Sequence, residues 1–413
     1  MIYIYRFLIN IIILLSPLII LIRLLKKKED IKRFKEKFSF FSKKRKAGKL
    51  IWFHTASVGE LLSIVSLIRS IEKNKKISQI LVTTTTLTSS KLFKKFKFKK
   101  TIHQFFPIDH NTFTKKFLNY WNPSIAIFVE SEIWPNMIKN LEKKSIMKIL
   151  LNARISKKSY KRWKLLGSFS KDLFKSFNLT LPQNTESKIY LNKLGAKKIK
   201  FLGNLKFAQN NFYNNSLDYK FKKFTKTKKF WCALSTHPGE EDVCSSVQVK
   251  LLKKFKNLVL VLIPRHVERV ESLSKELSKF NLRQHIHSDH KLINKDTNIY
   301  IVDAYGETSS FLEMCKIVFM GKSLTTDGGQ NPLEAARDNC SILHGPRVSN
   351  FSEIYKFLDK EKISFKINNQ KQLYKKLEFL LANKNKNFKI KNKINKIGNV
   401  ILLKNLKVIE SLV

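Results

Sequence analysis

Two series of short, continuous apolar runs, each run followed by a stretch with helical periodicity, constrain the fold of this chain more than any other feature. The first series comprises KLIWFHTA (49–56), ISQILVTTTT (77–86), PSIAIFVE (123–130) and IMKILLNA (146–153), and the second comprises KFWCALS (229–235), NLVLVLIP (257–264), NIYIVDA (298–304), KIVFMGKS (316–323) and CSILHGP (340–346). Runs of this kind are typical of parallel strands buried on both faces. We therefore predict two doubly wound α/β (Rossmann-like) domains, with ligands bound beyond the carboxyl ends of the strands.

The length of 413 residues is sufficient for two domains with full cores. The polar segment 208–228, rich in Asn and Lys, is the best candidate for a linker. We expect a hydrophobic anchor at 1–25, an N-terminal domain at 26–207 and a C-terminal domain at 229–390. Residues 391–413 are predicted to form a helical tail.

The N-terminus carries an apolar run, residues 7–22, interrupted only by Asn10 and Ser16. A spanning helix needs about 20 residues, and Leu24 and Leu25 extend the run past Arg23. No small-residue cleavage site follows, which argues against a signal peptide. The basic stretch RLLKKKEDIKRFKEKF comes next and places that side in the cytoplasm. We predict a single membrane anchor with cytoplasmic catalytic domains; shallow insertion without spanning is the alternative that the sequence leaves open.

The formal net charge of +49 has three candidate explanations: compositional drift, affinity for anionic lipids and nucleic-acid binding. The basic residues are 68 Lys and only 12 Arg, spread along the whole chain. Base-reading and bidentate phosphate sites usually favour Arg. We therefore expect anionic inner-membrane lipids, and no nucleic acid, among the partners.

Cysteine and histidine spacing gives no sign of a disulfide framework or of a metal site. The four cysteines are Cys232, Cys244, Cys315 and Cys340, and none forms a C-x-x-C pair. The chain therefore resembles a reduced, cytosol-exposed protein. The histidines show no metal-ligand spacing, so we expect neither a metal nor a cofactor.

The stretch FHTASVGELLSIVSLI (53–68) allows two interpretations of Glu60. Ser57 and Glu60 have the spacing of a capping box, in which Ser57 caps a helix and the Glu60 carboxylate reaches back to the Ser57 amide. The apolar run that follows has the helical periodicity that this requires. Alternatively, Glu60 is a catalytic carboxylate, and the local pattern does not decide between the two roles.

A second acidic motif follows the strand SIAIFVE, where the chain runs Glu130-Ser131-Glu132-Ile133-Trp134-Pro135-Asn136. Carboxylates just beyond a strand end lie where doubly wound sheets place their active sites. A structural role, with Glu130 and Glu132 solvated or paired, is equally compatible with the pattern. Pro135 suits the first turn of the next helix.

The second half contains three motifs suited to a nucleotide. CALSTHPGEEDV (232–243) is a strand followed by a Ser/Thr cap and an acidic first turn, and such a helix start can bind an anion. Arg265 follows a hydrophobic strand and is positioned to meet a phosphate. In FMGKSLTTDGGQNPLEAA (319–336), Gly328 and Gly329 allow close backbone approach, with Asn331 as cap and Glu334 as third helical residue. This last motif is either a capping box or a nucleotide clasp in which Glu334 accepts from ribose hydroxyls.

Taken in order, these motifs resemble the 3-deoxy-D-manno-octulosonic acid (Kdo) transferases of Gram-negative bacteria. The resemblance rests on HTASVGE, VESEIWPN, NARIS, LGNLKF, STHPGEE, IPRHVER and GGQNPLEAA, and it extends from the anchor to about residue 355. It implies the two-Rossmann-domain glycosyltransferase architecture called GT-B. It also implies transfer of Kdo from CMP-Kdo to the lipid A precursor (lipid IVA) in lipopolysaccharide core biosynthesis, with inversion and without a catalytic metal.

The resemblance also implies roles for individual residues. Glu60 matches the general base that deprotonates the acceptor hydroxyl, and Glu130 and Lys206 match positions that stabilise the transition state. The positions matching the CMP-binding site are Pro264, Arg265, Gly306, Glu307, Thr308, Asn331, Pro332, Leu333 and Glu334. These residue types fit the chemistry, because the transition state is cationic at the sugar while CMP departs as an anion.

The chain departs from the family pattern at three positions near the donor motifs. Lys322 stands where a second Gly is usual, Gln330 where His is expected, and Val267 where Pro is expected. Lys322 and Gln330 flank the expected nucleotide site and are expected to affect CMP affinity. The alternatives are a glycosyltransferase of the same plan with another nucleotide sugar or lipid acceptor, and a basic, membrane-tethered nucleic-acid-binding protein. A nucleic-acid-binding function would not explain why the acidic motifs occur in this order.

Overall fold

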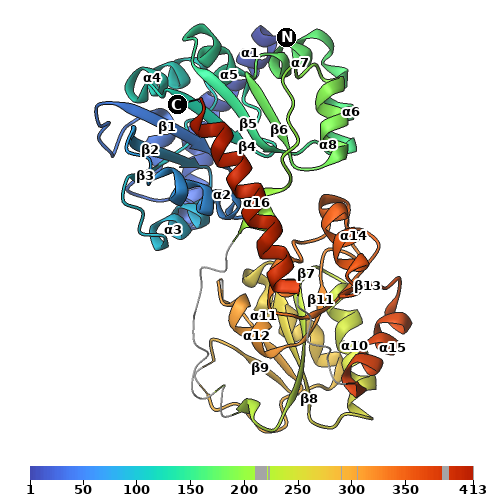
Figure 1. The fold of residues 1–413 in the computed structure, drawn as a ribbon. Helices are drawn as coiled ribbons and strands as arrows, with labels where there is room; N and C mark the ends of the chain where they lie inside the picture. Colours follow the sequence, from blue (N-terminus) through green and yellow to red (C-terminus); the bar gives the residue numbers. More distant parts are fainter. Residues whose placement is uncertain (210–220, 222–223, 290, 305, 384–389, 413) are drawn as a thin grey trace. The chain divides into compact units, whose positions relative to one another are not determined.

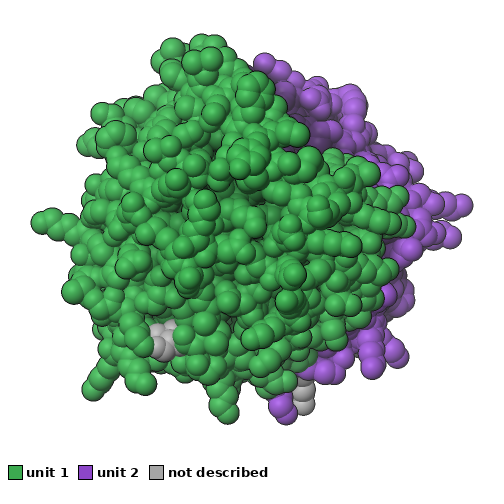
Figure 2. Space-filling model, turned by 90° about the horizontal axis from the view of Figure 1, so that it is seen from above, with its two compact units in different colours: residues 1–209, 397–413 green, residues 210–396 purple. Residues whose placement is uncertain are grey.

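In a computed structural model the chain divides into two compact units, residues 1–209 with 397–413 (unit 1) and residues 210–396 (unit 2) (Figure 2). The structure describes all residues except 210–220, 222–223, 290, 305, 384–389 and 413. Most of the expected linker 208–228 therefore lies outside the described residues. Each unit carries one parallel sheet (Figure 1).

Unit 1 is built on a six-stranded parallel sheet in the order β3-β2-β1-β4-β5-β6. Its strands are β1 (Lys49–His54), β2 (Ile77–Thr84), β3 (Thr101–Phe105), β4 (Ile125–Val129), β5 (Met147–Ala153) and β6 (Leu179–Pro182). The order reverses between β1 and β4, which is the switch point where doubly wound sheets bind ligands. Glu60 follows β1 and Glu130 follows β4, so the two glutamates flank this switch point.

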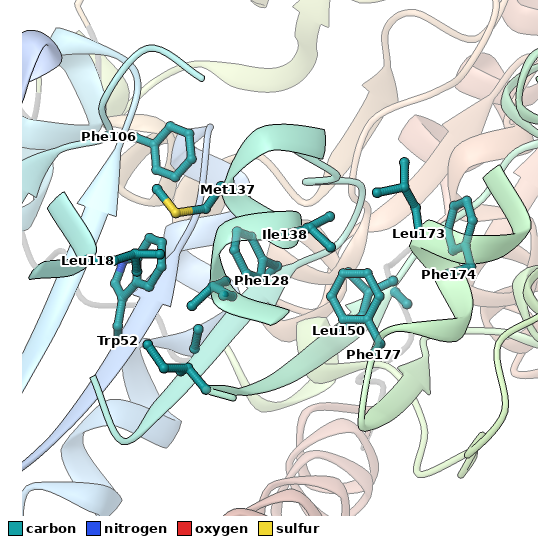
Figure 3. Packing of buried hydrophobic residues seen from close by; sticks show 14 of the residues in the cluster. Trp52, Phe106, Leu118, Phe128, Met137, Ile138, Leu150, Leu173, Phe174 and Phe177 are labelled. Carbon is teal, nitrogen blue, oxygen red and sulfur yellow. The ribbon is translucent and has the colours of Figure 1, made fainter. Parts of the chain in front are cut away.

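Helices precede, connect and follow these strands in unit 1. They are α1 (Ile2–Leu25), η1 (Phe34–Phe38), α2 (Val58–Ile71), α3 (Leu87–Lys95), α4 (Asn111–Trp121), α5 (Pro135–Lys143), α6 (Lys157–Leu165), α7 (Gly167–Lys175), α8 (Thr185–Lys193) and η2 (Leu205–Ala208). Pro135 is the first residue of α5, as predicted. The core packs Trp52 of β1 and Phe128 of β4 with Met137 of α5 (Figure 3), so the strand and helix that flank the Glu130 motif are held rigidly.

Unit 2 carries a seven-stranded parallel sheet in the order β13-β12-β11-β7-β8-β10-β9. Its strands are β7 (Lys229–Thr236), β8 (Leu258–Pro264), β9 (Gln284–Ile286), β10 (Ile299–Ile301), β11 (Ile317–Met320), β12 (Ser341–His344) and β13 (Ser364–Lys366). Its helices are α10 (Glu240–Leu252), η3 (Val267–Arg269), α11 (Val270–Leu277), η4 (Ser278–Phe280), α12 (Thr308–Met314), α13 (Leu333–Arg337), η5 (Ser349–Phe351), α14 (Ser352–Lys360) and α15 (Gln370–Ala382). The prediction of two doubly wound α/β units is confirmed, and every apolar run of both series contains a strand.

The C-terminal tail is a single helix, α16 (Ile390–Glu410), whose residues from 397 onward belong to unit 1. Gly398 lies against the turn that contains Lys206, since a Cβ added there would be 2.1 Å from the carbonyl oxygen of Phe207. Ile401 of the same helix packs against Gly203, where an added Cβ would lie 2.7 Å from the Ile401 Cδ1 atom. The helical character of the tail was predicted, whereas its return to unit 1 was not.

Candidate active site

Glu60 starts helix α2 and also presents its carboxylate to the backbone before the helix. Ser57 is the N-cap, and its Oγ accepts the Glu60 amide at 3.3 Å, as predicted. The carboxylate accepts the Ala56 amide at 2.7 Å and the Ser57 hydroxyl at 3.0 Å. The predicted partner, the Ser57 amide, was therefore wrong by one residue, because the side chain reaches past the cap toward the end of β1.

Three carboxylates meet beyond the ends of β1 and β4. The pKa of Glu60 is raised to about 8, chiefly by burial and then by the negative charges of Glu132 and Glu130. Hydrogen bonds from Ala56 and Ser57 act in the opposite direction but do not cancel this effect. A carboxylate whose pKa lies near neutrality is matched to the task of accepting a proton from a substrate hydroxyl.

Glu130 forms a buried ion pair with Lys206. Its carboxylate lies 2.6 Å from the Lys206 ammonium, and the two side chains are 7% and 8% exposed. The Glu130 backbone has a φ of +60°, and its amide and carbonyl bond to Leu151 and Arg154 of the next strand and loop. A positive φ is uncommon for a residue with a side chain, so the surrounding structure fixes the direction of this carboxylate.

The turn that carries Lys206 is held by asparagines from two motifs. The Asn204 side chain accepts the Lys206 amide, and the Asn152 side chain accepts the Leu205 amide, each at 3.0 Å. Asn152 belongs to the motif NARIS and lies near the end of β5, with a φ of +51°. No role was predicted for Asn152, whose only distinguishing feature in the sequence is that it is a polar residue at the end of an apolar strand.

His54, Glu132 and Trp134 form a second polar group beside Glu60. His54 is fully buried at the end of β1, and its Nε2 lies 3.2 Å from Glu132 Oε2. The Trp134 indole N–H donates to the same oxygen at 2.9 Å. On the other side of the ring, His54 Nδ1 lies 3.0 Å from the Thr83 hydroxyl. The structure thus fixes the Glu132 carboxylate, which contributes to the raised pKa of Glu60.

In unit 2, the first group of expected donor-binding residues follows β8 and β10. Pro264 is the buried last residue of β8, and Arg265 follows it with an exposed side chain. The Arg265 amide is bonded to the Thr236 carbonyl at the end of β7. Gly306 has a φ of +92°, and Glu307 Oε2 lies 2.8 Å from His287 Nε2 just before α12 begins at Thr308.

The second group surrounds the start of the five-residue helix α13, which begins at Leu333. Asn331 Oδ1 accepts the Leu333 amide at 3.2 Å, but the N-cap is Pro332 and Glu334 is the second helical residue. The predicted capping box with Asn331 as cap was therefore wrong by one residue. No side-chain cap bond is made at the start of α13, and the pKa of Glu334 is raised to about 7, chiefly by burial and then by Asp338.

The glycines before α13 serve the packing of the protein itself. Gly329 has a φ of +71°, and a Cβ there would lie 3.0 Å from the Val348 Cα. Gly328 has a φ of +116° and faces the Asn350 amide group. From the sequence, both glycines were expected to allow close approach of a ligand; in the structure both lie close to the loop after β12.

The Glu240 carboxylate accepts hydrogen bonds from the backbone of the loop after β11. It is fully buried, and its Oε1 accepts the Ser323 and Leu324 amides at 2.9 Å each. Oε2 accepts the amides of Lys322 at 2.7 Å and His237 at 3.1 Å. Helix α10 begins here with Gly239, not a Ser or Thr, as its N-cap. Lys322 adopts a φ of +56°, a conformation that Gly would adopt at lower cost.

Replacing Glu240 by alanine is expected to destabilise unit 2 by about 3 kcal/mol or more, because four backbone donors would lose their acceptor. Glutamine should have an intermediate effect, since its carbonyl replaces one carboxylate oxygen and its amide group cannot accept. Chemical unfolding measures both. The matched control is Asp242→Ala in the same first turn, where the side chain is 45% exposed. This variant loses its interaction with the helix dipole and an exposed ion pair with Lys279, each contributing at most about 1 kcal/mol. Equal effects of Glu240→Ala and Asp242→Ala would contradict this assignment.

No group of three or more His, Cys, Asp or Glu side chains is arranged to hold a metal ion within the described part of the chain. All four cysteines are free and buried, and burial raises the pKa of each thiol.

Two parallel, doubly wound units define the class of the protein as a GT-B-like α/β protein. A putative UDP-N-acetylglucosamine 2-epimerase from Listeria monocytogenes has a similar fold, with a TM-score of 0.63 and 13% identity over 88% of this chain and 96% of that chain. A glycosyltransferase from Rickettsia africae ESF-5 gives a TM-score of 0.58 at 11% identity, covering 89% and 99% of the two chains. Similarity at this level concerns the fold alone.

Sequence comparison identifies the family. The model of the family described as 3-deoxy-D-manno-octulosonic-acid transferase (kdotransferase) matches residues 32–209. The 3-deoxy-D-manno-octulosonic acid transferase of Rickettsia bellii is 35% identical over 92% of this chain and 91% of its own length. The protein of the same name from Haemophilus influenzae is 30% identical over 75% and 73%. The chain therefore belongs to the Kdo transferase family, and it is a glycosyltransferase.

Proposed function

We propose that this enzyme transfers Kdo from CMP-Kdo to the lipid A precursor lipid IVA, with inversion at the anomeric carbon. Membership of the Kdo transferase family supports the donor and the class of acceptor. The observation that carries the mechanism is the Glu60 carboxyl, which lies beyond the end of β1, beside Glu130 and Glu132, with a pKa raised to about 8. Its position at the switch point of the sheet and its raised pKa suit it to accept a proton from a substrate hydroxyl.

In the proposed reaction the acceptor hydroxyl oxygen attacks the anomeric carbon of Kdo. Its proton passes to the Glu60 carboxylate, while the bond between that carbon and the phosphate oxygen breaks and CMP leaves with the electron pair. The sugar carries positive charge in the transition state. The Glu130 carboxylate and its partner Lys206 are fixed in direction by their buried contacts, and fixed charges need no reorganisation as charge develops.

For the donor we propose that Pro264, Arg265, Gly306, Glu307, Thr308, Asn331, Pro332, Leu333 and Glu334 bind CMP. These residues lie at or beyond the carboxyl ends of strands of unit 2, where doubly wound sheets bind nucleotides. The exposed guanidinium of Arg265 suits the phosphate. The raised pKa of Glu334 suits a carboxyl that exchanges hydrogen bonds with ribose hydroxyls. No metal enters the proposed chemistry.

We also propose that α1 attaches the enzyme to the cytoplasmic face of the bacterial inner membrane, where the acceptor lipid and anionic lipids lie. The helix has 24 residues and a mean hydropathy of 2.6 in its most apolar window, which is compatible with a membrane anchor. The basic composition of the chain favours an anionic surface.

The direct test is incubation of the purified enzyme with CMP-Kdo and lipid IVA, with the product identified by mass and the anomeric configuration by NMR. Cytidine nucleotides are expected to raise the melting temperature, because a ligand of the folded state stabilises it. Stabilisation by a UDP-sugar but not by cytidine nucleotides would overturn the donor assignment and favour another nucleotide sugar.

Replacing Arg265 by alanine is expected to weaken CMP binding by about 10- to 100-fold, since a charge-assisted hydrogen bond to phosphate contributes about 1.5–3 kcal/mol. Isothermal titration calorimetry measures the affinity. The matched control is Arg283→Ala, which removes an exposed arginine of the same unit that pairs with Asp296 at the edge of the sheet. An equal, small loss in both variants would remove Arg265 from the donor site.

A further inference from the structure

Helix α1 is protected along one face over its whole length. The residues that are partly or fully buried are Ile2, Tyr5, Arg6, Ile9, Ile13, Ser16, Ile20, Arg23 and Leu24. Their spacing of three and four residues places them on one stripe of the helix. The stripe extends over about 33 Å at 1.5 Å per residue. Because α1 belongs to unit 1, this unit contacts the helix lengthwise and not only at its C-terminal end.

Polar contacts fix the N-terminal half of α1 to unit 1. The Tyr5 hydroxyl donates to Asp109 Oδ2 at 2.8 Å, and Arg6 Nε donates to Asn136 Oδ1 at 2.9 Å. One turn further, Asn10 Oδ1 lies 3.0 Å from a ring nitrogen of His110. These contacts are at the end of α1 farthest from the point where the chain continues into the rest of unit 1.

The contacts at the other end of α1 are ion pairs. Arg23 lies 2.6 Å from Glu29, and the same carboxylate oxygen lies 2.6 Å from the Lys37 ammonium. The Glu29 side chain is buried beneath this pair of cations. Both ends of the helix are therefore tied to the same unit.

Two links connect α1 to the helix that follows the acidic motif: the bond from Arg6 to Asn136 and the Asp109 carboxylate. Asp109, which accepts from Tyr5, also accepts the amides of Asn136 and Met137 in the first turn of α5. Helix α5 begins directly after the segment that carries Glu130 and Glu132. Helix α1 is thus hydrogen-bonded, through Asp109, to α5, the helix that follows the acidic motif.

The other face of α1 is exposed and almost wholly apolar. Its exposed large apolar residues are Met1, Tyr3, Ile4, Phe7, Leu8, Ile11, Ile12, Leu14, Leu15, Leu18, Ile19, Leu21, Ile22 and Leu25. Directly after it come Lys26, Lys27 and Lys28, all exposed. An apolar stripe with flanking cations matches the chemistry of a bilayer surface with anionic headgroups. A second copy of the chain would bring another net charge of +49 and be repelled.

We propose that α1 lies in the plane of the membrane surface, with its exposed face in the bilayer and its opposite face held lengthwise on unit 1, and that it does not cross the bilayer. The hydrocarbon core is about 30 Å thick, roughly the length of the protected stripe. A crossing helix would have to release the contacts of Tyr5, Arg6 and Asn10 or draw unit 1 into the hydrocarbon with it. The inference rests on the anchor in the proposed function and is independent of the sugar that is transferred.

The first test is the sidedness of the N-terminus in the full-length protein. One cysteine is placed in a short extension before Met1, and another, in a separate variant, at Ala47, an exposed position on unit 1. The four native cysteines are buried and give a low background. Each variant is treated with a membrane-impermeant maleimide in inverted inner-membrane vesicles and in intact spheroplasts. Labelling of both cysteines in inverted vesicles and of neither in spheroplasts is expected.

Labelling of the N-terminal cysteine in spheroplasts, with that of Ala47→Cys confined to inverted vesicles, would overturn the proposal, because the helix would then cross the bilayer. Failure of the wild-type protein to sediment with membranes would overturn it as well. Neither result depends on Kdo transfer, so the proposed reaction is tested separately by product formation.

A second test asks whether the exposed face of α1 contacts lipid or a second copy of the chain. Leu15→Glu is expected to lower binding to vesicles of phosphatidylethanolamine and phosphatidylglycerol by about tenfold in a flotation experiment, since one leucine is withdrawn from the apolar phase. Leu165→Glu changes an equally apolar residue that is 85% exposed on α6 and should leave binding unchanged. Unchanged vesicle binding of Leu15→Glu, together with dissociation of a dimer, would assign the face to a second copy and overturn the membrane assignment.

Discussion

Replacing Glu60 by glutamine is expected to lower the rate of Kdo transfer by about 10²–10⁴, the usual contribution of a general base. Glutamine has nearly the same size and keeps a carbonyl oxygen that can accept the Ala56 amide or the Ser57 hydroxyl. It cannot take up a proton. The rate of product formation and the melting temperature, measured on the same preparation, separate the catalytic role of Glu60 from its role at the start of α2.

The matched control is Ser57→Ala, which removes the cap and leaves the base. It should cost about 1 kcal/mol of stability, as loss of an N-cap commonly does, with only a small effect on the rate. A Glu60→Gln enzyme nearly as active as the wild type would return Glu60 to a purely structural role. The search for the base would then move to Glu132, which lies in the same group of carboxylates.

The pH dependence of the same variant follows from the raised pKa of Glu60. In the free enzyme the carboxyl loses its proton near pH 8, so kcat/KM of the wild type should rise as the pH increases through that value. Between the ordinary glutamate pKa of 4.5 and about 8, the folded state retains a proton that the unfolded state has released, so this group lowers stability as the pH rises. Glutamine does not titrate. The melting temperature of Glu60→Gln relative to wild type should therefore increase from pH 6 to pH 9.

Strands with a continuous apolar run were predictable from the sequence, and strands without one were not. β3 has the sequence Thr101-Ile-His-Gln-Phe105 and was missed, because its buried polar residues are satisfied only by distant partners. His103 contacts the Arg33 guanidinium and the Thr84 hydroxyl. The three-residue strands β9 and β13 and the short β6, at or near sheet edges, carry too few residues for a period to be recognised.

Local patterns also located part of the candidate site. The cap at Ser57 was predictable because donor and acceptor are three residues apart. Three of the four amides that Glu240 accepts were not, since they lie 82 to 84 residues further along the chain and meet its carboxylate only when β7 and β11 pair. The same holds for Lys206, whose contact with Glu130 depends on Asn152 holding the intervening turn. The family resemblance pointed to Lys206, but no local feature of the sequence explained it.

Replacing Lys206 by alanine is expected to destabilise unit 1 by about 3–5 kcal/mol, because it leaves the Glu130 carboxylate buried without its counter-charge. The matched control is Lys139→Ala, which breaks the exposed ion pair with Glu142 on α5 and should cost no more than about 1 kcal/mol. Chemical unfolding at constant pH measures both. A cost for Lys206→Ala as small as that of the control would mean that water reaches Glu130.

The double variant Glu130→Gln/Lys206→Met separates the structural contribution of this pair from its catalytic one. It removes both charges together and keeps side chains of similar size, so most of the lost stability should return. Kdo transfer should not return with it, because the proposed role of the pair is to present fixed charges to a cationic transition state. A double variant that regains both stability and activity would show that the pair serves the fold alone. A stable double variant without transfer, whose affinity for CMP is unchanged, would place Glu130 and Lys206 in the chemical step.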